Sequence, residues 1–255
     1  MAAGWAALVS LETSGAYPPL YKTGGLFFAV WGIYLFDRLF DSFRFPLIDL
    51  TPRRHAFAGR NRAVLFSLSA IAMVAAGVFI LPHVTRELVE AALFPGALCL
   101  LYFIVFRFVK RGLETSFPAK ELVIGFCFAS GVMVAAGTRF STLSSFVIEA
   151  ALATLFAGNC LIIGEAEREF DRRLDAAAFF GKAESGNWIP VALFAFSLAL
   201  AFITGGYLEL PLVGIALALT AVLEWACRRW AGTNWMQPLA DGALLFPWIL
   251  LVFFG

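Results

Sequence analysis

Long apolar segments separated by short charged loops are the feature that most constrains this chain. The segments run over about 24–40, 63–82, 88–106, 121–137, 142–164, 188–205, 209–227 and 238–254. Each has close to the ~20 residues with which a helix crosses a bilayer core of about 30 Å. Only helices and closed barrels satisfy their backbone hydrogen bonds there. Barrel strands alternate in polarity over about 10 residues, whereas these segments are continuously apolar, so we predict transmembrane helices.

The composition agrees with an all-α polytopic membrane helix bundle. The chain of 255 residues is 61% hydrophobic and 15% charged, whereas soluble domains carry about 25% charged residues. No polar stretch is long enough for a soluble domain, so we predict a single transmembrane domain over residues 1–255 in contact with membrane lipid. The net charge of +1 gives no sign of a nucleic-acid partner.

The N-terminal segment leaves the helix count open between eight and nine. Trp5–Leu11 is apolar but only about half the length of a bilayer span, and it ends at Glu12 before Tyr17-Pro18-Pro19. It is either a short first transmembrane helix or an interfacial one.

Basic residues predict the orientation. Sixteen of the 19 Lys and Arg residues fall on one face, within 38–62, 107–120, 168–182 and 228–229, and only Lys22, Arg86 and Arg139 fall on the other. Loops rich in Lys and Arg stay in the cytoplasm. We therefore predict a multi-pass integral membrane protein (of the inner membrane in a bacterium) whose 16-charge face is cytoplasmic.

Two acidic clusters lie at predicted cytoplasmic helix ends. In the first, Asp37 and Asp41 are four residues apart and share one helix face, with Tyr34 about one turn before them. In the second, polar residues recur at multiples of four and form one stripe that leads out of the membrane: Asn159, Glu167, Asp171 and Asp175.

Carboxylate pairs on two helices of one bundle suit a magnesium–diphosphate site. Mg²⁺ takes oxygen ligands, usually one or two carboxylates with water and substrate phosphates. The ion neutralises the charge that grows on a leaving diphosphate, and nearby Arg and Lys side chains bind the same oxygens. The alternative is that both clusters are solvated charges in i, i+4 pairs beside the membrane.

The acidic clusters carry a resemblance to a known family. Asp37-Arg38-Leu39-Phe40-Asp41 resembles the D-R-x-x-D core of the first motif of the UbiA superfamily of intramembrane prenyltransferases, and 167–172 (E-R-E-F-D-R) resembles its second motif, D-x-E-x-D-R. The family's Asn and first Asp of motif one fall on Ile33 and Tyr34 here. The resemblance implies a nine-helix bundle with the motifs on the second and sixth helices.

The resemblance also implies an activity and a set of site residues. The family transfers an isoprenoid from its diphosphate to a lipophilic, often aromatic, acceptor with the help of Mg²⁺. By resemblance, the metal-binding and catalytic residues are Asp37, Asp41, Glu167 and Asp171. The expected substrate-binding residues are Tyr34, Arg38, Tyr102, Lys110, Arg111, Lys120, Asn159 and Arg168. The basic residues among them are otherwise explained as cytoplasmic anchors.

Two other functions compete with a prenyltransferase. One is a non-catalytic protein or transporter of the same fold that binds lipid or isoprenoid ligands. Transporters often have repeats or broken helices, and Phe94-Pro95-Gly96 is the single clear break here. The other is a head-group transferase, whose D-G-x-x-A-R motif is absent from the sequence.

Isolated polar residues receive separate predictions. We expect Glu224 to pair with Arg228 on the next helical turn, and Asp241 to open the last helix or to pair with a loop Arg. Glu149 has no evident partner, and His55 is expected to be exposed in a loop.

Overall fold

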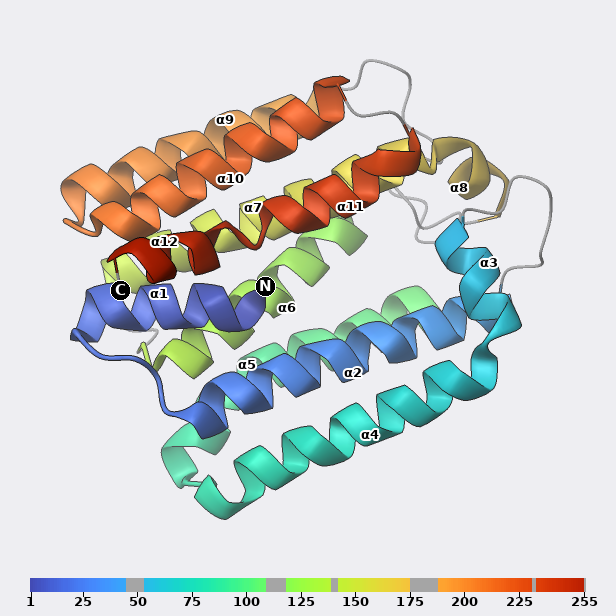
Figure 1. Cartoon of the computed structure of the whole chain (residues 1–255), viewed down its shortest axis with the longest axis horizontal. Helices are drawn as coiled ribbons and strands as arrows, with labels where there is room; N and C mark the ends of the chain where they lie inside the picture. Colours follow the sequence, from blue (N-terminus) through green and yellow to red (C-terminus); the bar gives the residue numbers. More distant parts are fainter. Residues whose placement is uncertain (45–52, 109–117, 139–141, 175–187, 231–232, 255) are drawn as a thin grey trace.

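The described part of the chain is a bundle of α-helices (Figure 1). The computed structural model describes residues 1–44, 53–108, 118–138, 142–174, 188–230 and 233–254, and these contain helices but no strand. The helices are α1 (Ala2–Ser14), α2 (Leu20–Arg44), α3 (Arg53–Arg60), α4 (Arg62–Ile80), α5 (Arg86–Tyr102), α6 (Ala119–Ala136), α7 (Leu143–Ala166), α8 (Arg168–Leu174), α9 (Ile189–Phe202), α10 (Pro211–Trp230), α11 (Thr233–Ala243) and α12 (Phe246–Phe254).

Seven helical segments in the described part are long and apolar enough to cross a membrane. They are Arg62–His83, Arg86–Phe106, Ala119–Ala136, Leu143–Ala166, Ile189–Tyr207, Pro211–Trp230 and Trp235–Phe254. They match the predicted segments from 63–82 onward, so the all-α polytopic membrane bundle is confirmed. The predicted segment 24–40 lies within α2, whose 25 residues extend over about 37 Å.

Two of the predicted spans differ in detail from the structure. Helix α5 continues through Pro95, so the expected break at Phe94–Gly96 is wrong. The last span is divided between α11 and α12, which are separated at Leu244 and Leu245. Asp241 accordingly lies near the end of α11 and does not open the last helix.

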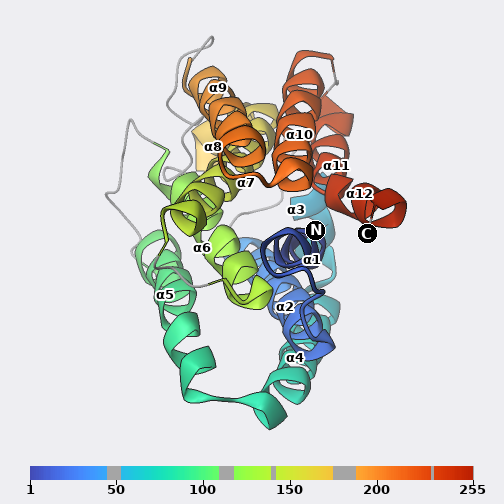
Figure 2. The ribbon, with the colours of Figure 1, turned by 90° about the vertical axis from the view of Figure 1, so that its left-hand side faces the viewer.

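Helix α1 lies inside the bundle (Figure 2). It contacts α2, α6, α10 and α12, and both Trp5 and Leu8 are fully buried. Thirteen residues extend over only about 20 Å. An interfacial helix would keep a polar face among the lipid head groups, so α1 is an internal helix.

Helix α7 forms the centre of the bundle. Most of its residues are buried, and it packs against α6, α9, α10 and α11. Gly125 lets α6 approach closely, because a side chain there would collide with the carbonyl of Ala153. Small residues allow this close packing between membrane helices.

Three acidic side chains join helices outside the cavity described below. Glu12 of α1 accepts hydrogen bonds from the first amides of α10, at 2.8 Å from Leu212 and 2.6 Å from Val213. Glu165 of α7 bonds Arg228 of α10 at 2.6 Å. The predicted Glu224–Arg228 pair is therefore wrong.

The third of these side chains, Glu149 of α7, has a partner that the sequence did not reveal. Ser130 of α6 donates a hydrogen bond to Glu149 Oε1 at 2.5 Å. The pair is buried where α6 and α7 pack together.

The short helices α3 and α8 lie at one end of the bundle, beside the C-terminal ends of α2 and α7 (Figure 1). The two acidic segments, whose nearest acids Asp41 and Glu167 are 126 residues apart in sequence, therefore reach the same end. This arrangement positions the candidate site.

Candidate functional site

A cavity of about 460 Å³ opens among α1, α2, α3, α5, α6, α7 and α11. Aromatic and aliphatic side chains form much of its wall, including Phe27, Trp31, Phe128, Phe156 and Leu244. Its polar and charged lining residues are Tyr34, Asp37, Arg38, Asp41, His55, Tyr102, Lys120, Glu121, Asn159, Glu167, Gln237 and Asp241. An apolar chamber with a few convergent polar groups is the usual form of a small-molecule site.

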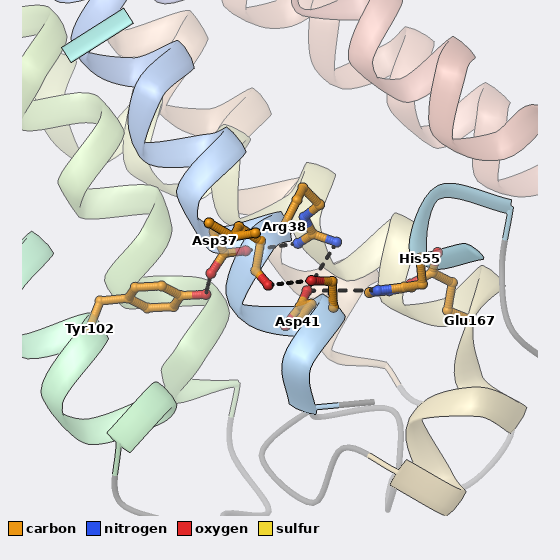
Figure 3. A network of polar contacts seen from close by, with 8 residues as sticks. Asp37, Arg38, Asp41, His55, Tyr102 and Glu167 are labelled. Carbon is orange, nitrogen blue, oxygen red and sulfur yellow. Dashed lines mark hydrogen bonds and ion pairs between the residues drawn. The ribbon is translucent and has the colours of Figure 1, made fainter. Parts of the chain in front are cut away.

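The two aspartates of α2 face the cavity together. Arg38 lies between them, with Nη2 2.9 Å from Asp37 Oδ2 and Nη1 3.3 Å from Asp41 Oδ2. Tyr102 of α5 donates a hydrogen bond from its hydroxyl to Asp37 Oδ1 at 2.8 Å. The guanidinium of Arg38 also lies over the ring of Tyr34, 5.4 Å from its centre. One network thus joins Asp37, Arg38 and Asp41 of α2 with Tyr102 (Figure 3), and Tyr34 lies beside it.

His55 connects the two acidic segments. Its Nδ1 lies 3.8 Å from Asp41 Oδ2, and its Nε2 lies 3.4 Å from Glu167 Oε2 (Figure 3). The ring stacks on Phe170 of α8, with 5.0 Å between centres. His55 lies on α3 and is only 7% exposed, so the prediction of an exposed loop histidine is wrong. The sequence holds no ligand spacing around His55 that could have revealed this contact.

Glu167 ends α7 and lies directly before α8. Its amide bonds the carbonyls of Ile163 and Gly164, which turns the chain at the cavity. Asp171 falls in α8, but its side chain lies outside the described residues, as do Lys110, Arg111 and Asp175.

The remaining predicted residues divide into two groups. Lys120 and Asn159 line the cavity, the former from the start of α6 and the latter from α7. Arg168 begins α8 but is not among the described residues that line the cavity. Glu121, which follows Lys120, also lines the cavity and is buried. The sequence analysis did not predict Glu121 as a site residue, although it directly follows Lys120, which was predicted to bind substrate.

Asp241 of α11 lines the cavity on the side of α7. Asn159 donates a hydrogen bond from Nδ2 to Asp241 Oδ1 at 3.1 Å. The sequence placed Asp241 near the start of a helix, and it gave no sign that this residue would meet α7.

The arrangement brings three carboxylates of the predicted metal set to one cavity, together with three basic side chains. Asp37, Asp41 and Glu167 supply oxygens, and Arg38, His55 and Lys120 supply positive or neutral donors. Within the described ranges, no three His, Cys, Asp or Glu side chains are grouped closely enough to hold a metal ion by themselves. Such a surface suits an anionic ligand that brings its own oxygens and cations.

Comparisons with protein-family models, with curated proteins and with solved structures found no match to this chain.

Proposed function

We propose that the protein is a UbiA-like prenyltransferase that moves an isoprenoid from its diphosphate to a lipophilic acceptor. One observation carries the proposal: the side chains of Asp41 and Glu167, from the two motif-like segments, lie on either side of His55 at the polar end of an apolar cavity. A diphosphate with an apolar chain combines the two chemistries that such a cavity accommodates.

The side chains at this end fit magnesium. Mg²⁺ prefers carboxylate oxygens and usually takes only one or two of them, while water and substrate phosphates fill its other positions. Asp37, Asp41 and Glu167 offer that kind of oxygen ligand, and Asp171 is the fourth residue expected from the motif. Bound with the diphosphate, the ion would neutralise the charge that develops on the leaving group.

The basic and apolar side chains of the cavity would bind the diphosphate, exclude water and stabilise the carbocation. Arg38 and Lys120 are positioned to bind diphosphate oxygens at the polar end of the cavity. The apolar wall would surround the isoprenoid chain and exclude water, which protects a reactive allylic cation from hydrolysis. Aromatic faces such as those of Trp31 and Phe128 would stabilise that cation.

The proposal includes a topology. If α1 and α2 are counted with the seven apolar spans of the described chain, the membrane bundle would have nine helices, and the acidic segments would end the second and the sixth of them. We infer that the end bearing α3 and α8 faces the cytoplasm, because α3 ends at Arg60 and α8 begins at Arg168, two of the basic residues that the sequence assigns to the cytoplasmic face.

A non-catalytic binder of isoprenoid diphosphates is the second candidate. It is favoured by Ile33 and Tyr34, which line the cavity where the family has Asn and Asp. Fewer oxygen ligands on α2 would weaken catalysis more than binding, since the ion must stabilise the leaving group in the transition state.

Release of diphosphate by the purified full chain tests the proposal. Detergent-solubilised protein should convert a panel of geranyl, farnesyl and geranylgeranyl diphosphates, offered with phenolic and quinol-type acceptors, only when Mg²⁺ is present. Asp41→Asn should abolish the reaction. Glu90→Gln, which changes an exposed acid bonded to Arg86, should leave it intact.

The two candidates give different results in the same experiment. Mg²⁺-linked binding without turnover would favour the non-catalytic candidate. Neither turnover nor Mg²⁺-linked binding across the panel would refute both candidates.

A further inference from the structure

A second polar group lies on the wall of the cavity where α7, α10 and α11 meet. Asn159 and Asp241 line the cavity and are joined by their hydrogen bond of 3.1 Å. Glu224 of α10 lies behind them, fully buried, and interacts electrostatically with Asp241. The group lies within the bundle, on the α11 side of the cavity.

Two observations, one on Glu224 itself and one on Thr220 of the same helix, place the carboxyl group of Glu224 in this junction. Its Oε2 lies 3.6 Å from the position that a side-chain carbon on Gly158 of α7 would occupy. One turn earlier on α10, the hydroxyl of Thr220 donates to the carbonyl of Ala243 at 3.5 Å, which turns this face of α10 toward α11. Glu224 therefore points between α7 and α11.

This wall presents acceptor oxygens to the cavity and its surroundings. Within the described ranges, neither oxygen of Glu224 has a hydrogen-bond partner, and neither does Oδ1 of Asn159, which is 6% exposed. Unsatisfied buried oxygens are costly, and acids within a membrane usually mark functional positions. A ligand on the Asp241 side should therefore be a hydrogen-bond donor.

We propose that Asp241 and Asn159 bind the hydroxyl group of a phenol-type acceptor, and that Asp241 removes its proton. The inference rests on the proposed function, because it assigns the acceptor side of the same cavity. In the transfer, the bond between the allylic carbon and the diphosphate oxygen breaks and its electron pair leaves with the diphosphate. An electron pair of the acceptor forms the new bond to that carbon, and the hydroxyl proton passes to Asp241.

Glu224 is a positioning residue in this scheme. It does not line the cavity among the described residues, but its carboxyl group interacts electrostatically with Asp241, and repulsion between two acids would direct the Asp241 side chain away from Glu224, toward Asn159 and the cavity. Its effect should therefore reach the acceptor through Asp241.

Binding of two matched probes tests the hydroxyl contact. 2-Naphthol has a phenolic hydroxyl, and 2-methoxynaphthalene has the same ring system without the donor, so their comparison cancels partition into detergent. The purified full chain should bind 2-naphthol about tenfold more tightly, the scale of one hydrogen bond to a charged group. Asp241→Asn should remove most of this preference, while Glu149→Gln, a change in a buried acid outside the cavity, should preserve it.

Binding of geranylgeranyl diphosphate with Mg²⁺ in the same samples separates the two proposals. Asp241→Asn should retain it, and Asp41→Asn should lose it while keeping the preference for 2-naphthol. Absence of Mg²⁺-linked diphosphate binding by the wild-type chain would overturn the proposed function. Equal binding of the two naphthalenes by the wild type, or an unchanged preference in Asp241→Asn, would overturn the acceptor site.

The role of Glu224 has its own readout. Glu224→Gln should lower kcat for transfer without changing KM for the diphosphate, because the donor side of the cavity is untouched. Equal changes in both constants, or no change in either, would show that Glu224 does not position Asp241.

Discussion

The carboxylates that line the cavity differ from those that join helices, although both kinds include buried side chains. Asp37 is 8% exposed and Glu149 is 6% exposed, so burial does not separate the two kinds. Glu149 bonds one serine between two helices, whereas Asp37 contacts Arg38 and Tyr102 and also faces an open chamber. We therefore expect acids that face the cavity to contribute to function, and acids whose contacts are enclosed between helices to contribute to stability.

The largest expected effects are on the two aspartates of α2, and Asp37 should follow Asp41. Asp37→Asn should reduce Mg²⁺-dependent turnover by about 100-fold or more, the scale of losing one preorganised electrostatic group in an active site. The thermal midpoint should fall as well, because Arg38 loses one of its two carboxylate partners, so the rate is measured on the variant that remains folded. Rates at saturating diphosphate measure the effect, and Glu149→Gln is the control. Equal losses of turnover in both variants would remove the distinction between the two kinds of acid.

The contact of His55 with both segments predicts a smaller loss. His55→Gln should reduce turnover about tenfold, the lower end of the range for partners that orient metal ligands. The matched control is the other histidine, His83, which stacks on Tyr21 in an exposed position outside the cavity. His83→Gln should retain full turnover. A reduction in both variants would show that His55 acts through general stability.

Much of the fold could be read from the sequence because hydrocarbon imposes a strong rule on it. Continuous apolar segments in lipid must be helical, and their lengths identified all seven spans that the described chain contains. The Asp37 and Asp41 pair was predictable for the same kind of reason, since residues four apart share a helix face. Tyr102 and Lys120 were found by resemblance alone.

The contacts that sequence reasoning missed all join residues far apart in the chain. His55 reaches Glu167 across 112 positions, and Asn159 reaches Asp241 across 82. Periodicity describes one helix at a time, so it predicts neither which helices pack together nor their rotation. Glu224 illustrates the limit. The spacing of four residues predicted an ion pair between Glu224 and Arg228, but α10 packs on α7 so that Arg228 pairs with Glu165.

Among the acids that join helices, Glu12 should contribute most to stability. Glu12→Ala should lower the free energy of unfolding by about 2 kcal/mol, because two amides at the start of α10 lose a charged acceptor. Unfolding in mixed micelles measures this. Glu90→Ala, which removes an exposed partner of Arg86, should cost only about 0.5 kcal/mol. Turnover of the folded Glu12→Ala protein should equal that of wild type, and a specific loss of turnover would place α1 in the chemistry of the cavity.

The smallest effect on the free energy of unfolding is expected for the buried hydrogen bond between Ser130 and Glu149. Ser130→Ala should lower the free energy of unfolding by about 0.6 kcal/mol, the average for hydrogen bonds between membrane helices. Ser130→Ala combined with Glu149→Gln measures the coupling in a double-mutant cycle. Because Ser130 and Glu149 contact each other and not the cavity, the coupling should appear in unfolding and not in turnover. A coupling in turnover would mean that Glu149 influences the site although it does not line the cavity. The distinction between acids that line the cavity and acids that join helices would then be wrong.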